Sequence, residues 1–165
     1  MKKKGKMIIL TIIIILWMAF IFSMSAKNST QSSSISGGFT YKILSMFFAQ
    51  FRSIDKTTQD SIVEGLQFVV RKGAHFTAYA ILGGLCFADL RVLDKFKLKI
   101  NFIIALVISA LYAASDELHQ YFVPGRSCEI RDVMIDSLGA LTGITVVIIF
   151  SKLIEKIKQI RTAKK

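Results

Sequence analysis

Cysteine and proline are scarce in this chain, and acidic residues are outnumbered two to one. Its 165 residues include two cysteines, one proline, and 11 acidic against 22 basic side chains. Cys86 lies inside an apolar run and Cys128 in a short polar loop, so we expect them at different depths and do not predict a disulfide. Neither CxxC nor HExxH occurs, and this leaves no sequence signature of a redox centre or a zinc enzyme.

The net charge of +11 is not distributed as in a nucleic-acid-binding protein. Zinc-finger spacing, RNA-binding signatures and basic heptads are all absent. The lysines instead stand at the ends of apolar runs, and the hydrophobic residues, 53% of the chain, are bunched rather than alternated. This pattern is typical of proteins whose solvent is lipid. We therefore expect a membrane protein without a nucleic-acid partner.

Four apolar runs predict four transmembrane helices. The first has twenty uncharged residues, about 30 Å of helix, and follows four lysines. We interpret it as a retained anchor rather than a cleaved signal peptide, because its apolar part is long for a signal sequence. Each of the other runs reaches the usual ~20 residues only if its polar flanks are also helical. The predicted fold is all-α, a single domain over residues 1–165, with spans at about 7–26, 72–90, 99–118 and 133–151.

Lysine and arginine are placed asymmetrically about these spans. Fourteen of them precede the first span, lie between the second and third, or follow the fourth, and eight lie in the other segments. Because cytoplasmic loops carry the excess of positive charge, we expect both termini in the cytoplasm and residues 27–71 in an outer loop.

The outer loop has two parts of different composition. We interpret the serine-rich SAKNSTQSSSISGG as a solvated loop without a core. FTYKILSMFFAQF, residues 39–51, predicts an amphipathic helix that either lies on the outer membrane surface or packs against the bundle.

With this topology the polar flanks of spans two, three and four all lie at the outer face. Each flank forms a stripe of polar side chains at helical spacing. A charge inside a membrane is costly unless it has a partner, so we expect the three helices to join these residues in one outward-facing pocket. The stripes are Arg71, His75 and Tyr79; Tyr112, Asp116, His119 and Gln120; and Asp132, Asp136, Gly139 and Gly143.

Two local features favour close packing of these helices. Gly139 and Gly143 form a small-xxx-small pair, which lets another helix approach closely. Pro124-Gly125 lies in the short connection between spans three and four and favours a turn, so those two helices should be neighbours.

Three segments resemble the VanZ-like family of bacterial membrane proteins, which is named after a protein associated with resistance to the glycopeptide teicoplanin. The segments are RKGAHFTAYAILG, SDELHQYFVPGR and RDVMIDSLGALTG, and the resemblance covers residues 71–143. It implies a multi-pass protein of the bacterial plasma membrane, but no agreed reaction. The positions that match the family's motifs are Arg71, Lys72, His75, Tyr79, Asp116, Glu117, Gln120, Arg126, Asp132, Asp136 and Gly139.

Three interpretations of the pocket remain open. Its residues could form a hydrogen-bonded network that only fixes helix packing. Our preferred hypothesis is that they bind the anionic head group of a membrane lipid or a lipid-linked cell-wall precursor, which would connect the chain to teicoplanin resistance. They could also catalyse hydrolysis or transfer on a phosphate-bearing lipid-linked substrate. The cations of the binding hypothesis are Arg71, Lys72, Arg126 and Arg131.

The catalytic hypothesis depends on His75 or His119 as general acid or base, oriented by Asp116 or Asp136. No nucleophile elbow or P-loop supports it. The same side chains and Asp132 are suitable metal ligands, but without a metal-binding spacing we expect neither a metal nor a cofactor. A transport path is disfavoured because the charges crowd toward one face. The oligomeric state is left open.

Overall fold

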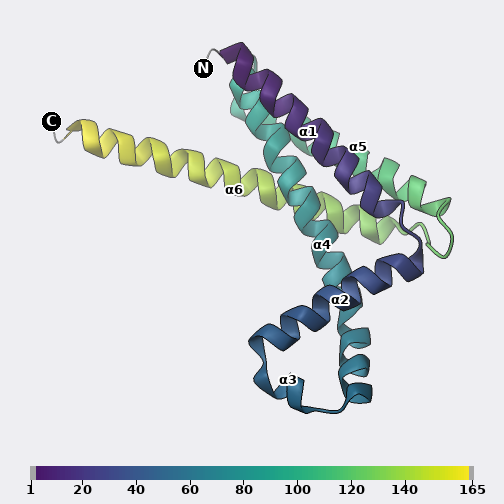
Figure 1. Cartoon of the computed structure of the whole chain (residues 1–165). Helices are drawn as coiled ribbons and strands as arrows, with labels where there is room; N and C mark the ends of the chain where they lie inside the picture. Colours follow the sequence, from purple (N-terminus) through teal and green to yellow (C-terminus); the bar gives the residue numbers. More distant parts are fainter. Residues whose placement is uncertain (1–2, 164–165) are drawn as a thin grey trace.

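The computed structural model describes residues 3–163, which form six helices and no strand (Figure 1). Four of these helices, α1, α4, α5 and α6, are long and apolar enough to cross a membrane. The predicted all-α bundle of four spanning helices is therefore confirmed. The helices are α1 (Lys3–Ser25), α2 (Ser29–Phe47), α3 (Ala49–Ser53), α4 (Lys56–Leu93), α5 (Leu98–Tyr121) and α6 (Ile130–Ala163).

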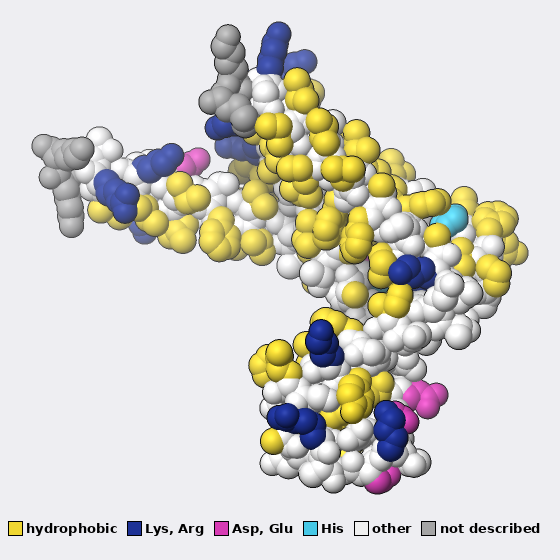
Figure 2. All heavy atoms as spheres, viewed as in Figure 1, with side chains coloured by type: hydrophobic (Ala, Val, Ile, Leu, Met, Phe, Trp, Pro, Cys, Tyr) yellow, Lys and Arg dark blue, Asp and Glu magenta, His cyan; other side chains and the backbone are white. Residues whose placement is uncertain are grey.

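Side-chain contacts define the two ends of the bundle. α1 and α4 are antiparallel, because Lys3 Nζ lies 3.4 Å from the Asp94 carboxylate at one end. In the middle of both helices, Trp17 Nε1 donates to the Ala78 carbonyl at 2.9 Å. At the opposite end α1 and α5 finish and α6 begins, and we call this the polar end. Lysine and arginine side chains gather near the amino terminus and on the far half of α6, whereas hydrophobic side chains cover α1 (Figure 2).

α4 and α6 are longer than the predicted spans. They contain 38 and 34 residues, or about 57 and 51 Å of helix against a hydrocarbon core of about 30 Å. The expectation that the polar flanks are helical is met, because α4, α5 and α6 all continue without a break through their polar residues. Only part of α4 can therefore lie within the membrane core.

The serine-rich segment is helical, so the predicted solvated loop is wrong. α2 begins inside it, where the Asn28 side chain accepts from the Gln31 amide at 2.9 Å and the Gln31 side chain accepts from the Asn28 amide at 3.3 Å. This capping box satisfies donors that a helix start otherwise leaves without partners. Buried Ser36 and Thr40 each donate to a carbonyl one turn earlier, and their small size lets α2 pack against α4. These contacts depend on the positions of single residues, so the serine-rich composition of the segment does not predict them.

α2, α3 and residues 56–70 of α4 form a lobe that extends beyond the polar end (Figure 1). The helix predicted over residues 39–51 is interrupted after Phe47, where one extended residue separates α2 from α3. Phe51 is buried inside the lobe, but Phe39 and Phe47 are exposed. The segment thus packs against α4 on one side and leaves an apolar face open on the other.

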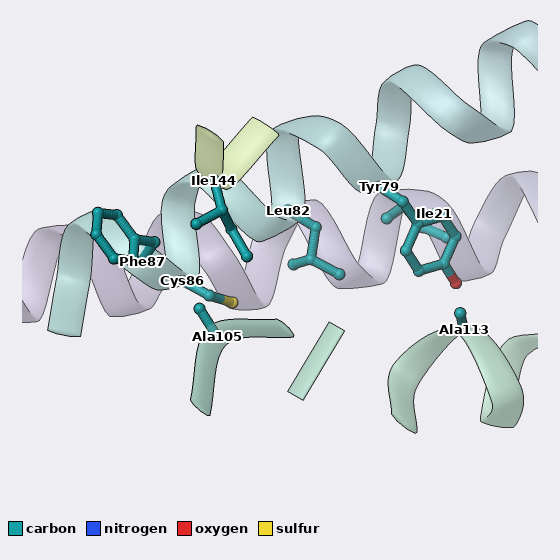
Figure 3. Close-up of a cluster of buried hydrophobic side chains, with 8 residues drawn as sticks. All are labelled: Ile21, Tyr79, Leu82, Cys86, Phe87, Ala105, Ala113 and Ile144. Atoms are coloured by element: carbon teal, nitrogen blue, oxygen red, sulfur yellow. The ribbon is translucent and has the colours of Figure 1, made fainter. Parts of the chain in front are cut away.

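α4 and α6 cross with their backbones in contact. A Cβ atom added to Gly139 would overlap the backbone of Phe76, and one added to Gly143 would overlap the backbone of Ala80. Lipid tails are as apolar as leucine, so the association of these helices depends on such close van der Waals packing rather than on exclusion from water. The buried core beside the crossing includes Tyr79, Leu82, Cys86, Phe87 and Ile144 (Figure 3).

Candidate functional site

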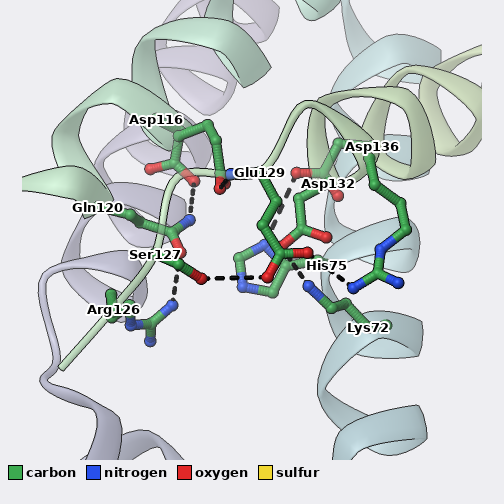
Figure 4. Close-up of polar contacts among 11 residues, drawn as sticks. Lys72, His75, Asp116, Gln120, Arg126, Ser127, Glu129, Asp132 and Asp136 are labelled. Carbon is green, nitrogen blue, oxygen red and sulfur yellow. Dashed lines mark hydrogen bonds and ion pairs between the residues drawn. The ribbon is translucent and has the colours of Figure 1, made fainter.

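α4, α5 and α6 bring polar side chains together at the polar end (Figure 4). α5 contributes from its last turns, α6 from its first turns, and α4 from its middle, because α4 continues into the lobe. The α5–α6 connection contributes further residues. We call this group the polar cluster, and it consists of Lys72, His75, Asp116, Gln120, Arg126, Ser127, Glu129, Asp132 and Asp136.

One ion pair and one histidine–carboxylate contact join α4 to α6 within the polar cluster. Lys72 Nζ contacts the carboxylate of Asp132, and His75 Nδ1 lies 3.7 Å from Asp136 Oδ2. The first pair is partly buried, and the Asp136 side chain is only 5% exposed. The Lys72–Asp132 and His75–Asp136 contacts and the glycine crossing follow in this order along both helices. The two helices therefore point in the same direction where they cross. Removing one partner of the Lys72–Asp132 pair would leave a poorly solvated charge, which is destabilising.

A chain of hydrogen bonds connects α5 to α1 through Asp116. The Ser25 hydroxyl donates to Asp116 Oδ2 at 2.7 Å, and Gln120 Nε2 donates to the same oxygen at 3.3 Å. Arg126 Nη1 then donates to Gln120 Oε1 at 2.7 Å, and Arg126 Nε donates to the Lys27 carbonyl at 3.0 Å. Arg126 is therefore held in place by neutral acceptors from two separate segments.

The α5–α6 connection is fixed from both sides. The Glu117 carboxylate, buried in α5, accepts from the backbone amide of Glu129 at 2.6 Å. Gly125 has a φ of 75°, which favours glycine, and an added Cβ would collide with Ser29 at the start of α2. The turn predicted from Pro-Gly is therefore present, and the lobe is packed directly against it.

A polar cavity of about 100 Å³ lies between the lobe, α4 and this connection. Two carboxylates line it, and each already has a cation: Asp132 pairs with Lys72, and Glu129 pairs with Arg131 at 2.7 Å. Arg71 and Arg126 also line the cavity, and within residues 3–163 neither forms an ion pair with a carboxylate. Within this described part of the chain, two guanidinium groups without a carboxylate at ion-pair distance therefore face the same space.

Electrostatics at the mouth of the cavity follow from these contacts. Partial burial, and next the positive charge of Arg71, lower the pKa of Arg126, while the more distant carboxylates of Asp116, Glu117 and Asp132 act in the opposite direction. Hydrogen bonds from Ser127, then from Arg131, lower the pKa of the exposed Glu129 carboxyl. It is therefore ionised at neutral pH and already bound to Arg131. An anion between the two unpaired arginines would relieve their mutual repulsion.

Some predicted site residues lie outside the polar cluster. Tyr79 is fully buried beside Tyr112, with 6.1 Å between ring centroids, and it does not line the polar cavity. The His119 ring stacks on Phe22 of α1 at 4.3 Å. In the described part of the chain, His119 therefore makes no contact with the His75–Asp136 pair. Arg131 is exposed and bound to Glu129.

Sequence reasoning missed four participants: Ser25, the Lys27 carbonyl, Ser127 and Glu129. Ser25 and the Lys27 carbonyl come from the end of the first span, which carries no charge and offers only a serine as a signal. Ser127 and Glu129 lie in a stretch that the family motifs do not cover, and no other signal indicated them. No signal in the sequence indicates that a backbone carbonyl holds Arg126.

The arrangement has two chemical capacities. The unpaired arginines can bind an anion through charge-assisted hydrogen bonds. His75 borders the cavity with a carboxylate at its Nδ1 side, which can orient its other nitrogen for proton transfer. Among residues 3–163, no three His, Cys, Asp or Glu side chains are grouped to hold a metal ion.

The family model described as VanZ/LLP1 matches residues 10–151 of the chain. The chain belongs to the VanZ/LLP1 family. The match includes most of α1, the lobe, α4, α5, the first two thirds of α6 and the whole polar cluster, so this VanZ-like chain is a multi-pass membrane protein. No curated protein and no solved structure is significantly similar to it.

Proposed function

We propose that the polar cavity binds the anionic head group of a membrane lipid or a lipid-linked cell-wall precursor. The observation that carries this proposal is the pair of guanidinium groups, Arg71 and Arg126, which face the cavity without a carboxylate partner. Arginine suits this task because its planar fork of donors matches phosphate oxygens in a bidentate way. Two other cations of the polar end are already paired, Lys72 with Asp132 and Arg131 with Glu129, so they are not available to an anionic ligand.

The proposal includes an orientation in the bacterial plasma membrane. Both termini lie in the cytoplasm, and the polar end faces outward, where wall precursors are used. The native cysteines allow a direct check, because Cys128 is exposed beside the cavity and Cys86 is buried. A membrane-impermeant maleimide should label intact cells, and Cys128→Ser should abolish the labelling. Labelling only after the cells are opened would reverse the orientation.

Head-group binding is tested by native mass spectrometry of the full chain with anionic and zwitterionic lipids. Arg71→Gln and Arg126→Gln should each weaken retention of phosphate-bearing anionic lipids about tenfold or more, since hydrogen bonds to charged groups contribute about 1.5–3 kcal/mol. Arg52→Gln removes the same charge from an exposed site in the lobe and is the matched control. Equal retention by all four proteins would refute the proposal.

We further propose that occupancy of this site contributes to glycopeptide resistance. Cells that express the chain should tolerate more teicoplanin than cells that express Arg71→Gln at equal abundance. Equal susceptibility, together with Arg71-dependent lipid binding, would separate the binding activity from any role in resistance.

The second candidate function is a hydrolase or transferase acting on a phosphate-bearing lipid-linked substrate. The His75–Asp136 pair beside the polar cavity favours it. His75 would give a proton to the leaving oxygen or take one from the attacking water. A new lipid product that disappears with His75→Gln would support this function, and unchanged lipid after incubation would leave head-group binding as the activity.

A further inference from the structure

A second cavity, of about 230 Å³, adjoins the polar cavity and is largely apolar. It lies between the last turns of α1, the first half of α2 and the middle of α4, so three helices from different parts of the chain enclose it. Three residues line both cavities: Arg71, His75 and Arg126. The unpaired arginines therefore stand at the boundary of a polar and an apolar space.

The walls explain why the apolar cavity is not filled by side chains. α2 contributes Ser32 and Ser36, and α4 contributes Ala74 and Ala78. These small residues face one another where larger ones would close the space. The serine-rich segment thus forms one wall of the cavity. Its amino-terminal end is bonded to the α5–α6 connection, where the Ser29 amide donates to the Pro124 carbonyl at 3.4 Å.

The cavity is open toward the side of the bundle. Phe20, Ile35 and Phe39 line it and are 48%, 43% and 58% exposed. These positions belong to α1 and α2, whose outer faces are apolar. A ligand can therefore enter from the lipid phase without crossing the polar cluster.

From these observations we propose that the apolar cavity holds the head-proximal part of one hydrocarbon chain of the amphiphile whose anionic head occupies the polar cavity. This inference rests on the proposed function. From Arg71 to Ala78 the cavity follows α4 for about 10 Å, roughly a third of a hydrocarbon core. Its volume is below the about 300–1,000 Å³ of sites that enclose a whole small molecule, so it fits a segment of one chain and leaves the rest in lipid.

The two cavities have different tasks in this proposal. Moving a chain from lipid into an apolar cavity gains little, because lipid tails are as apolar as the protein walls. The arginines therefore supply the affinity, and the apolar cavity selects ligands by the shape of the chain next to the head group.

The test uses hexadecyl phosphate with a photoactivatable diazirine on the carbons nearest the head, added to the full chain in phosphatidylcholine nanodiscs. Crosslinks should map to the cavity walls in α1, α2 and α4. Ala74→Trp, which fills the cavity from an exposed position on α4, should reduce these crosslinks at least tenfold, and Ser32→Phe should do the same from the opposite wall. Thr77→Trp, on the exposed side of the same helix, is the matched control and should leave them unchanged.

The outcomes distinguish the two proposals. Crosslinks that depend on Arg71 but not on Ala74→Trp or Ser32→Phe would overturn the chain site and leave head-group binding intact. Crosslinks that are spread over the lipid-facing side of α5 and do not depend on Arg71 would overturn both.

Discussion

α4 has two sides of opposite character. Toward α6 it makes a closed seam, in which glycines bring the backbones into contact, and the Lys72–Asp132 ion pair and the His75–Asp136 contact lie at the polar end. Toward α1 and α2 it borders an open cavity, although the residues there are also small. Small residues on α4 therefore allow either backbone contact with a neighbouring helix or an empty cavity beside it. Which of the two occurs depends on the contacts that position the neighbouring helix. The backbone of α6 is in contact with α4, whereas the start of α2 is bonded to the α5–α6 connection.

The two sides of α4 also have different roles. The seam fixes the positions of His75 and Lys72 on α4, because their partners lie on a helix that cannot shift. The open side carries Arg71, one residue away in the sequence, toward the cavities. A single helix can thus present a rigid face and an accessible face at the same depth.

The largest expected effect comes from breaking the seam with Gly143→Ala. An added methyl group overlaps the backbone of Ala80, which cannot rotate away, so we expect a loss of about 1–3 kcal/mol or more in unfolding free energy. Thermal unfolding in detergent measures it. Gly65→Ala, which has open space around it on the same helix as Ala80, should be neutral or stabilising by up to about 1 kcal/mol. Equal midpoints for both variants would show that the seam is not closely packed.

A smaller effect is expected at the polar end of the seam. Asp132→Ala leaves the partly buried Lys72 without its carboxylate, and we expect a loss of about 2 kcal/mol, below the 3–5 kcal/mol typical of fully buried pairs. Lys72→Ala in the same chain should restore part of the loss. If the double variant loses as much unfolding free energy as the two single variants together, Lys72 and Asp132 are not energetically coupled.

The smallest effect is expected in the lobe, far from the seam. Hydrogen bonds from the side chain and then the amide of Thr58 lower the pKa of Asp55, the exposed cap of α4. A carboxyl whose pKa is lowered by folding stabilises the folded state above its unfolded pKa of about 3.9, and this contribution is lost as the pH falls through the folded value.

Amide hydrogen exchange over residues 56–60 reports this cap. Protection there should decrease as the pH falls below about 4 after correction for intrinsic exchange, and Asp55→Ala should remove the pH dependence. Protection at the seam should not change. A seam that loosens together with the cap would mean that α4 unfolds as one unit and that its two sides are not independent.

Much of the spanning architecture was predictable because lipid imposes simple demands on sequence. Uncharged runs near 20 residues, lysines at their ends and polar flanks that must be helical all follow from the thickness of the hydrocarbon core. The i, i+4 spacing of Asp132 and Asp136 places both on one face of α6, where they meet Lys72 and His75. His119 shows the limit of such spacing, because it lies near the same stripe as Asp116 yet stacks on α1.

The lobe was not predictable in the same way. Serine-rich composition argues against a core, but α2 needs only a cap, two buried hydroxyls and a neighbouring helix. None of these depends on average composition. The apolar cavity was equally hidden, since it lies between α1, α2 and α4, and the start of α2 is positioned by contacts with residues more than ninety positions away.

Local rules of helix formation and membrane insertion thus selected the number of spans, their polar ends and the side chains available for a site. The packing of the helices decided which of those side chains neutralise one another and which remain unpaired beside a cavity. Ionic and steric interactions act through space, and spacing along one helix cannot specify the distance to another. For that reason the unpaired state of Arg71 and Arg126 belongs to the tertiary structure alone.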